Sequence, residues 1–301
     1  MANKYSIMDI EQNDITNKRG YLHSDFTFFH LQDKTEIQIE PHFHDFNKVI
    51  VFLSGQVTYY IEGIAYQLQP WDILLVSRDM IHKPCIDSSI PYRRMVLWVK
   101  PAFLSQQSSE TCNLHTCFDL AARHKFSLLR MKPETQHVIQ PLLAQIHAAN
   151  DNRRFGDDVL KTALCLQLIV YLNRLALENN NGTIPAEAGL EYNETMNQVL
   201  RYIDSHIAED VSLEKLESVF FLNKYYLMHK FKQYIGFSIH QYVLQKRLIT
   251  ANKLIRSGHS VVAACLESGF RDYSNFSRAF KKVYGTSPKK YNSRQAGEFS
   301  N

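Results

Sequence analysis

A chain of 301 residues has room for two domains that each bury a core of their own. The five cysteines are odd in number and scattered, which excludes a disulfide-built scaffold, and the first twenty residues contain no apolar run typical of an export signal. The formal charge of +4 is unevenly distributed: Asn193 onward carries 16 Lys and Arg against 9 Asp and Glu, whereas the preceding residues carry 18 against 21. A basic C-terminal part is typical of a protein that binds a polyanion, although an ordinary basic surface would give the same balance.

The first third of the sequence predicts short strands. Between about Tyr21 and Val99, runs of β-branched and aromatic residues alternate with turn signals such as Ser54-Gly55 and Glu62-Gly63. The predicted strands are residues 35–40, 48–53, 56–61, 65–68 and 72–76. Many short, evenly spaced strands indicate a small barrel or jelly roll.

Helical periodicity follows over residues 135–149 and 155–177, and each segment carries a broad apolar stripe. The second segment has apolar residues on nearly two faces, which is more than one contact with a barrel requires. We therefore expect this helical pair to form a dimer contact, with packing onto the barrel's own surface as the alternative. The longest apolar stretch, residues 163–177, is interrupted by polar side chains and is too short to cross a bilayer, so the protein is expected in the cytoplasm.

A polar stretch rich in Asn and Gly, from Glu178 to Gly189, has no helical or strand period and indicates a linker. Beyond it, the sequence predicts seven helices and almost no strand. The fold class is therefore multidomain α+β. The expected parts are a barrel, a helical pair, a linker and an all-α domain, at residues 1–132, 133–178, 179–192 and 193–296.

Two segments of the all-α domain repeat one pattern 49 residues apart. Asn223 and Asp272 are good N-cap residues, and each opens a helix that a shorter amphipathic segment precedes. Helix, short turn and capped helix, present twice, indicate two helix-turn-helix units at about residues 213–236 and 261–285. The exposed face of each second helix is polar, aromatic or cationic, as expected of a helix that enters a DNA groove.

One amphipathic helix, from Ile239 to Arg256, is predicted between the two units. A helix of this length is a rod of roughly 27 Å, at a rise of about 1.5 Å per residue. It would hold the two second helices near the ~34 Å repeat of the major groove, so that one chain reads two successive groove segments. Gly236 and Gly285 stand where each second helix ends and a left-handed residue is favoured.

Segment 270–291 reads FRDYSNFSRAFKKVYGTSPKKY, and segment 242–251 has the pattern Tyr-x4-Arg-Leu-x2-Ala. In both segments, this domain resembles the AraC/XylS family of transcription regulators. In one departure, Phe220 stands where the family usually has a glycine, whereas the second unit has Gly269 there. The turn of the first helix-turn-helix unit is therefore expected to differ in geometry from the family's usual turn.

The resemblance implies which side chains face DNA. The implied contacts are Lys224, Tyr225, Met228, His229 and Lys232 in the first unit, and Tyr273, Ser274, Ser277, Arg278, Lys281 and Lys282 in the second. Arg278 is the best candidate for a bidentate guanine contact, and Lys224 for a base edge or a phosphate. The other lysines, together with Lys289 and Lys290, are expected to bind phosphates, although a solvated helix face explains any one of them equally well. The residues expected in the core are Leu227, Phe231, Phe276 and Phe280.

At the other end, Pro41-His-Phe-His44 and the strands after it resemble the cupin barrel that members of this family often carry as a ligand sensor. His42 and His44 lie two apart on a strand and therefore share one face, where His82 would join them. In metal-binding cupins a carboxylate completes the set four positions after the second His, but this chain has Lys48 there. A cation at that position disfavours a metal ion, so no metal and no other cofactor is expected.

Without a metal, the same face becomes a polar pocket for a neutral or anionic small molecule, such as a sugar or a small acid. The expected lining residues are His42, His44, Lys48, Tyr59, Trp71, His82 and Arg93. Each histidine by itself is better explained as a hydrogen-bonded barrel residue, and only the three together indicate a pocket.

Together, these features predict a sequence-specific DNA-binding transcription regulator that responds to a small-molecule effector. It is expected to be a homodimer and an activator, because most family members with this domain order activate, and an activator would also contact RNA polymerase. The alternative is a metal-dependent cupin enzyme with a DNA-binding tail, which Lys48 disfavours. Because the sequence contains no catalytic triad pattern, phosphate loop or dinucleotide fingerprint, no catalytic residue is expected. A non-specific DNA-packaging protein is a third alternative, and it would bind all DNA sequences alike.

Overall fold

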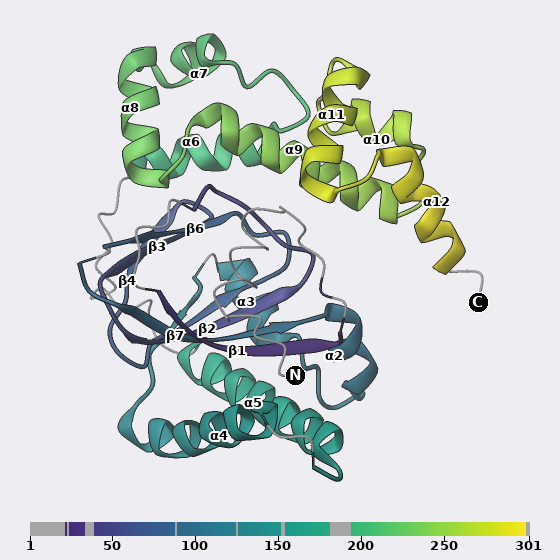
Figure 1. Cartoon of the computed structure of the whole chain (residues 1–301). Helices are drawn as coiled ribbons and strands as arrows, with labels where there is room; N and C mark the ends of the chain where they lie inside the picture. The colour runs from purple at the N-terminus through teal and green to yellow at the C-terminus, as the bar shows by residue number, and fades with distance from the viewer. Residues whose placement is uncertain are drawn as a thin grey trace. The chain divides into compact units, whose positions relative to one another are not determined.

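Figure 1 shows the computed structural model of the chain, which describes residues 22, 24–33, 39–87, 89–124, 126–151, 154–180 and 194–298. The described residues form two compact units, one up to residue 180 and the other from residue 194 to residue 298. The predicted linker, residues 179–192, lies outside the described residues except for its first two, which end a helix.

The N-terminal unit contains two antiparallel sheets (Figure 1). The five-stranded sheet has the order β1 (Phe26–Asp33), β7 (Tyr92–Val99), β2 (Asn47–Ser54), β5 (Ile73–Val76) and β8 (Leu128–Leu129). The three-stranded sheet has the order β4 (Ile64–Gln67), β3 (Val57–Ile61) and β6 (His82–Ile86). The four predicted strands between residues 48 and 76 are confirmed, with shifts of one residue at their ends. The strand predicted at residues 35–40 lies mostly outside the described residues.

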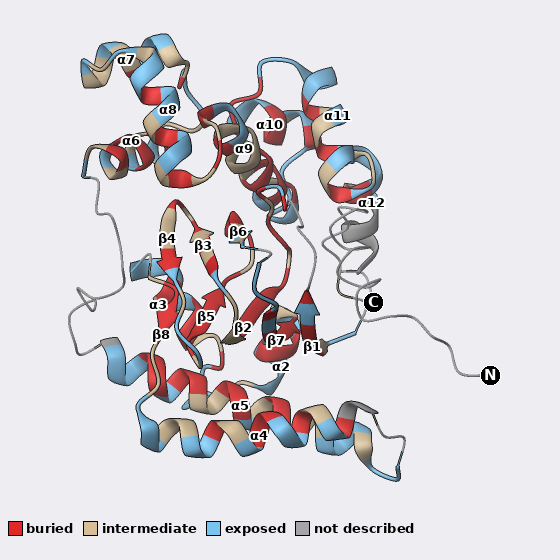
Figure 2. Ribbon diagram, turned by 60° about the vertical axis from the view of Figure 1, so that its left-hand side comes forward, coloured by how far each residue is buried: buried red, intermediate tan, exposed pale blue. Residues whose placement is uncertain are grey.

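Both faces of the five-stranded sheet are apolar and covered. One face packs towards the three-stranded sheet around a set of buried aromatic residues: Phe46, Phe52, Tyr59, Tyr66, Tyr92 and Trp98. The other face is covered by α2 (Pro101–Gln107), α3 (Thr116–His124), α4 (Pro133–Asp151) and α5 (Asp157–Asn180) (Figure 2). Because both faces are buried, residues 49–53 of β2 are apolar at every position rather than at alternate ones.

Helix α5 is 24 residues long and, by length and composition alone, is apolar enough to cross a membrane. The expectation that this stretch is too short is therefore wrong, because the helix extends beyond residues 163–177 on both sides. In the structure, one side of α5 belongs to the core of the N-terminal unit. The buried amide of Asn173 accepts a hydrogen bond from the backbone nitrogen of Cys117 at 2.6 Å and donates one to the backbone oxygen of Leu114 at 3.2 Å. The polar interruption of the stripe thus joins α5 to α3 and to the loop before it.

The described part of the C-terminal unit consists of seven helices, as predicted (Figure 1). They are α6 (Glu194–Ser205), α7 (Leu213–Phe220), α8 (Lys224–Ile235), α9 (Ile239–Arg256), α10 (Val261–Glu267), α11 (Tyr273–Tyr284) and α12 (Pro288–Glu298). Helix α9 has the predicted bounds. The pairs α7–α8 and α10–α11 are the two predicted helix-turn-helix units.

Side-chain caps determine where these helices begin and end. The carboxyl or amide oxygens of Asn223 and Asp272 accept hydrogen bonds from backbone N–H groups in the first turns of α8 and α11. Ser238 and the glutamine three residues later form a capping box at the start of α9. Gly236 and Gly285 end α8 and α11 in the left-handed conformation, with φ of 84° and 71°. These boundaries are local in origin, which is why the sequence predicts them closely.

Candidate DNA-reading surface and histidine cluster

Helices α8 and α11, the second helices of the two units, each have one fully buried face. Leu227 and Phe231 in α8, and Phe276 and Phe280 in α11, are all 0% exposed. The prediction that these four are core residues is confirmed. Figure 2 shows buried and exposed positions on opposite sides of these helices. The buried face of each helix thus packs in the core of the domain, and the opposite face lies in solvent.

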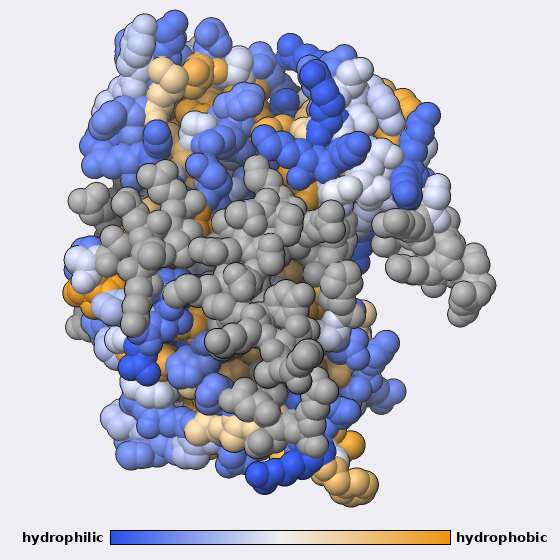
Figure 3. All heavy atoms as spheres, viewed as in Figure 1, coloured by the Kyte–Doolittle hydropathy of each residue, from blue (hydrophilic) through white to orange (hydrophobic). Residues whose placement is uncertain are grey.

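The residues expected to face DNA lie on these outer faces. The exposed ones are Tyr225, Met228, His229, Lys232, Tyr273, Ser274, Arg278, Lys281 and Lys282, and the half-buried ones are Lys224 and Ser277. Lys289 and Lys290 of α12 are also exposed. Hydrophilic residues predominate on the side of this unit that Figure 3 shows.

The two outer faces differ in their chemistry. Helix α8 exposes 69% of Tyr225, 43% of Tyr226 and 40% of Met228, so its face is rich in aromatic and apolar groups. Helix α11 instead presents Arg278, whose Nε donates to the backbone oxygen of Ser274 at 3.4 Å and whose Nη2 donates to the side-chain oxygen of Asn275. These hydrogen bonds hold the guanidinium along the outer face of its own helix.

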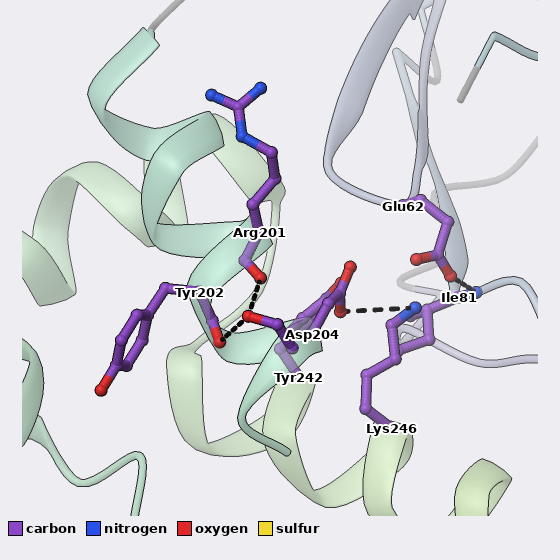
Figure 4. Close-up of polar contacts among 8 residues, drawn as sticks. Glu62, Ile81, Arg201, Tyr202, Asp204, Tyr242 and Lys246 are labelled. Carbon is purple, nitrogen blue, oxygen red and sulfur yellow. Dashed lines mark hydrogen bonds and ion pairs between the residues drawn. The ribbon is translucent and has the colours of Figure 1, made fainter. Parts of the chain in front are cut away.

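Helix α9 is joined to α6 by a small polar network (Figure 4). The hydroxyl of Tyr242 donates to Oδ1 of Asp204 at 2.8 Å. The Nζ of Lys246 lies 3.7 Å from the same oxygen and 5.4 Å from the centroid of the Tyr242 ring. One carboxylate therefore ties two successive turns of α9 to α6, which fixes the rod at the end that carries the first unit.

Arg247 of α9 lies between the two helix-turn-helix units. Its Nε donates to the backbone oxygen of Ile207 at 3.0 Å and its Nη2 to that of Glu209 at 2.8 Å, in the segment that leads into the first unit. The turn of the second unit lies against the same guanidinium, since a Cβ atom added to Gly269 would be 2.9 Å from Nε. The arginine of the 242–251 pattern thus connects both units to the rod.

The turn of the first unit is built differently from that of the second. Helix α7 ends at Phe220, and the left-handed residue is Phe221, with φ of 54° and ψ of 36°. In the second unit the left-handed residue is Gly269, with φ of 88°. The turn between α7 and α8 spans residues 221–223, whereas the turn between α10 and α11 spans residues 268–272. The shorter first turn therefore moves the left-handed position one residue past the site where the repeat pattern places a glycine.

We expect Phe221→Gly to raise the free energy of unfolding of the C-terminal unit by about 1 kcal/mol. A non-glycine residue in the left-handed region costs about 1–2 kcal/mol, and glycine removes this cost. Glycine also loses more conformational entropy on folding, so the net stabilisation is smaller than the cost removed. The side chain of Phe221 is 92% exposed, so its removal sacrifices little packing. Urea denaturation of the full chain, followed by circular dichroism, measures the change. Phe220→Gly is the matched control and should destabilise, because Phe220 lies within α7 and contacts the ring of Tyr202.

Three histidines meet inside the N-terminal unit. His42 and His82 pair across an antiparallel bridge with two backbone hydrogen bonds, of 3.1 and 2.8 Å, so their side chains point to the same face. His44 lies two residues further along and shares that face. The ring centroids are 4.3 Å apart for His42 and His82, 4.9 Å for His42 and His44, and 5.1 Å for His44 and His82. The structure thus brings together the three histidines that the sequence singled out.

Burial keeps these histidines neutral. Burial, with the charge of Lys48 as a second cause, lowers the pKa of His42 to about 4. Burial and the neighbouring groups hold the pKa values of His44 and His82 well below the ordinary range. At neutral pH each ring therefore offers a nitrogen lone pair rather than a charge.

Lys48 and Tyr59 lie with the histidines on the inner face of the sheets. Lys48 is 7% exposed, and its Nζ lies 6.0 Å from the ring centroid of Trp98, one of the buried aromatic residues. The ring of Tyr59 stacks against that of His82 at a centroid distance of 6.1 Å. Five of the seven residues expected to line the pocket therefore share one interior face.

The other two expected pocket residues, Trp71 and Arg93, do not lie on this interior face. Trp71 packs against the helix-covered core on the opposite side of the sheet. Arg93 is exposed, and the inward-facing position of β7 belongs to Arg94, which is 4% exposed. Arg94 Nη1 lies 2.7 Å from Oδ2 of Asp33. Because Tyr92 is buried on the inner face, the strand period of two places Arg93 outside and Arg94 inside.

Two family models match the chain. A model described as an AraC-like ligand binding domain matches residues 27–169, and a model described as a helix-turn-helix domain matches residues 216–294. The first covers most of the described N-terminal unit, and the second covers both helix-turn-helix units with the rod between them.

Similar proteins include several transcription regulators. The probable transcriptional regulator LumQ of Photobacterium leiognathi is 26% identical over 253 residues, which are 83% of this chain and 90% of LumQ. The HTH-type transcriptional activator RhaS of Enterobacter sp. (strain 638) is 26% identical over 250 residues, which are 82% of this chain and 85% of RhaS. A solved structure of ToxT from Vibrio cholerae has 15% sequence identity and a TM-score of 0.34, with 90% of this chain and 98% of ToxT covered.

Proposed function

The chain belongs to the AraC/XylS family of transcription regulators, with an N-terminal ligand-binding domain and a C-terminal helix-turn-helix domain, and on that premise we propose that it activates transcription in response to a small-molecule effector. The observation that carries the proposal is the pair of solvent-facing helices, α8 and α11, attached to one rod, α9. We assign the barrel to residues 1–132, the helical pair to 133–178, the linker to 179–192 and the DNA-binding domain to 193–296. The protein acts in the cytoplasm, where it contacts DNA and RNA polymerase.

Specific reading of DNA is tested at Arg278. With an operator selected from random duplexes, Arg278→Ala should lower affinity for that operator by about 1–3 kcal/mol and relax the preference at one base pair, because a bidentate contact to guanine is lost. Fluorescence anisotropy of the full chain on the operator and on single-base variants measures both effects.

Lys281→Ala is the matched control for Arg278→Ala, since Lys281 is exposed on the same helix. A phosphate contact carries no sequence information, so this variant should weaken binding to all duplexes alike and lower the salt slope by about 1. Equal weakening of every duplex by Arg278→Ala would instead support a non-specific DNA-packaging protein.

The proposed effector is a sugar or a small acid that contacts His42, His44, Lys48, Tyr59 or His82. The support is the shared interior face of these residues, which combines aromatic rings with hydrogen-bonding groups. Thermal-shift screening of the full chain should find a compound that stabilises it by about 2.7 kcal/mol at 100 times its dissociation constant. Lys48→Met should abolish the shift and Arg93→Met, on the exposed face, should not. An unchanged shift in Lys48→Met would place the effector elsewhere.

We further propose that the chain is a homodimer, joined through the outer face of α5. The buried side of α5 packs in its own core, but Val159 is 74% exposed, Leu160 48% and Leu177 49%, so about half or more of each of these side chains is in solvent. Val159→Asp combined with Leu160→Asp should convert the dimer to a monomer in sedimentation velocity, because a carboxylate in an apolar contact is costly. Glu134→Gln on α4 is the control and should remain dimeric. A monomeric wild-type chain overturns this proposal.

A further inference from the structure

Apolar and aromatic side chains cluster on the surface where α8 begins. Tyr225 is 69% exposed and Met228 40%, and the two lie three residues apart, so they are neighbours on one side of the helix. Tyr226, which is 43% exposed, and Phe221, which is 92% exposed, belong to the same short stretch, residues 221–228. Single exposed apolar residues are common, but a cluster of them marks a surface that a partner covers.

Helix α11 has no such cluster on its outer face. Within α11, Tyr273 is 36% exposed, and the remaining exposed side chains, Arg278 among them, are polar. We infer that the two units read different bases, and that α8 reads thymine through contact of Tyr225 and Met228 with its C5 methyl group. The inference rests on the proposed DNA-binding function and adds the base that the first unit recognises.

The position and chemistry of these two side chains match the thymine methyl group. In a helix-turn-helix unit, residues near the N-terminus of the second helix contact base edges in the major groove. Tyr225 and Met228 are the second and fifth residues of α8. The methyl group of thymine is the one apolar group on the base edges of that groove, where the other groups are donors or acceptors. An apolar side chain against those donors or acceptors would leave them without a hydrogen-bond partner, so the same contact disfavours other base pairs.

The backbone at the start of α8 is already hydrogen-bonded. The backbone nitrogen of Lys224 donates to Oε1 of Glu217 at 3.2 Å, and that of Tyr225 donates to Oδ1 of Asn223 at 2.8 Å. A free helix N-terminus often binds a phosphate through such N–H groups, but here the first two are directed at side-chain oxygens. Recognition at this end of α8 therefore depends on side chains.

The charge of α8 favours DNA as the partner that covers the cluster. The helix has three lysines and no acidic residue. The Nζ of Lys224 lies 5.9 Å from the ring centroid of Tyr225, and Lys232 is exposed one turn after Met228. Cations beside an apolar surface complement a groove that is lined by phosphates, because the phosphates attract the lysines while the base edges meet the apolar groups.

Replacement of thymine by uracil tests the inference without a change in the protein. Uracil lacks the C5 methyl group but keeps the hydrogen-bonding groups of thymine. In an operator selected from random duplexes, thymines are replaced by uracil one at a time, and fluorescence anisotropy measures the affinity of the full chain. At one or more positions within a single groove segment, affinity should fall about 3- to 5-fold, the loss expected when one methyl group is no longer buried.

Two sets of variants assign this effect to α8. Tyr225→Ala combined with Met228→Ala should bind the thymine and uracil duplexes alike, because the side chains that contact the methyl group are absent. Val262→Ala, at a 57% exposed position of α10, is the matched control and should keep the full difference. Arg278→Ala should also keep it, since Arg278 belongs to the second unit.

The outcomes separate this inference from the proposed function. If the wild type prefers its operator to a scrambled duplex but binds the uracil duplexes as tightly as the thymine duplex, only the inference is overturned. A uracil effect that persists in the double variant overturns it as well. Equal binding of the operator and the scrambled duplex by the wild type would overturn the proposed function, and the inference with it.

Discussion

Arg94→Met should lower the free energy of unfolding of the N-terminal unit by about 3–5 kcal/mol. The side chains of Arg94 and Asp33 are only 5% and 9% exposed, and Nη1 lies 2.7 Å from Oδ2. The guanidinium also lies over the ring of Tyr92, at 4.2 Å from its centroid. Removal of the arginine leaves the carboxylate of Asp33 buried without its opposite charge, and this loss of compensation makes the effect large.

Two further variants separate charge from packing at this pair. Arg93→Met changes the exposed neighbour of Arg94 and should alter stability by no more than about 0.5 kcal/mol. Asp33→Leu combined with Arg94→Met removes both charges and should recover most of the stability, since a buried ion pair is often replaced by apolar residues at little cost. Urea denaturation of each full-length variant gives the values. If Arg93→Met costs as much as Arg94→Met, the inward direction of Arg94 is wrong.

Gly269→Ala should lower the free energy of unfolding of the C-terminal unit by about 2–5 kcal/mol. The left-handed conformation at this position costs a non-glycine residue about 1–2 kcal/mol. The added Cβ would lie 2.6 Å from the backbone oxygen of Ile207, 2.9 Å from Cα of Ala208 and 2.9 Å from Nε of Arg247, and forced repacking costs about 1–3 kcal/mol more. Two of these three atoms are backbone, which cannot move aside as a flexible side chain does.

Gly258→Ala is the matched control for this prediction. Gly258 also has a positive φ, of 93°, but a Cβ added there meets nothing within 4 Å. It should therefore cost only the backbone term of about 1–2 kcal/mol. Because Arg247 is displaced in Gly269→Ala but not in Gly258→Ala, only the former should also weaken operator binding. Equal costs for the two glycines would show that the close approach of Gly269 to the 207–208 backbone does not limit the turn.

The contrast between Gly269 and Phe221 shows where the repeat pattern stops being informative. The pattern places a residue opposite Gly269 at position 220, but the left-handed residue of the first unit is Phe221. The difference arises because α7 continues to Phe220 and leaves a shorter turn before α8. Helix length is a balance of small local terms, and a one-residue change does not alter the spacing of the motif residues on either side.

The prediction of the pocket residues was also correct only where a local pattern determines the position of a side chain. The sequence placed His42 and His44 on one face because a strand has a period of two, and the structure agrees. It assigned Trp71 and Arg93 to the pocket on chemical grounds alone, and both lie on other faces. Both faces of the sheet are apolar, so hydrophobic alternation does not reveal which side of a strand is the interior.

By itself, the sequence determined the two capped helix-turn-helix units, the rod between them and the separation of a basic all-α domain from a β-rich one. Those features follow from caps, helical period and charge, which act over a few residues. Only the tertiary structure decided that Arg94 pairs with Asp33 and that Arg247 lies against Gly269. Each of these contacts joins residues some 20 to 60 positions apart in the chain. They depend on strand register and helix packing, which the whole core sets and no local pattern encodes.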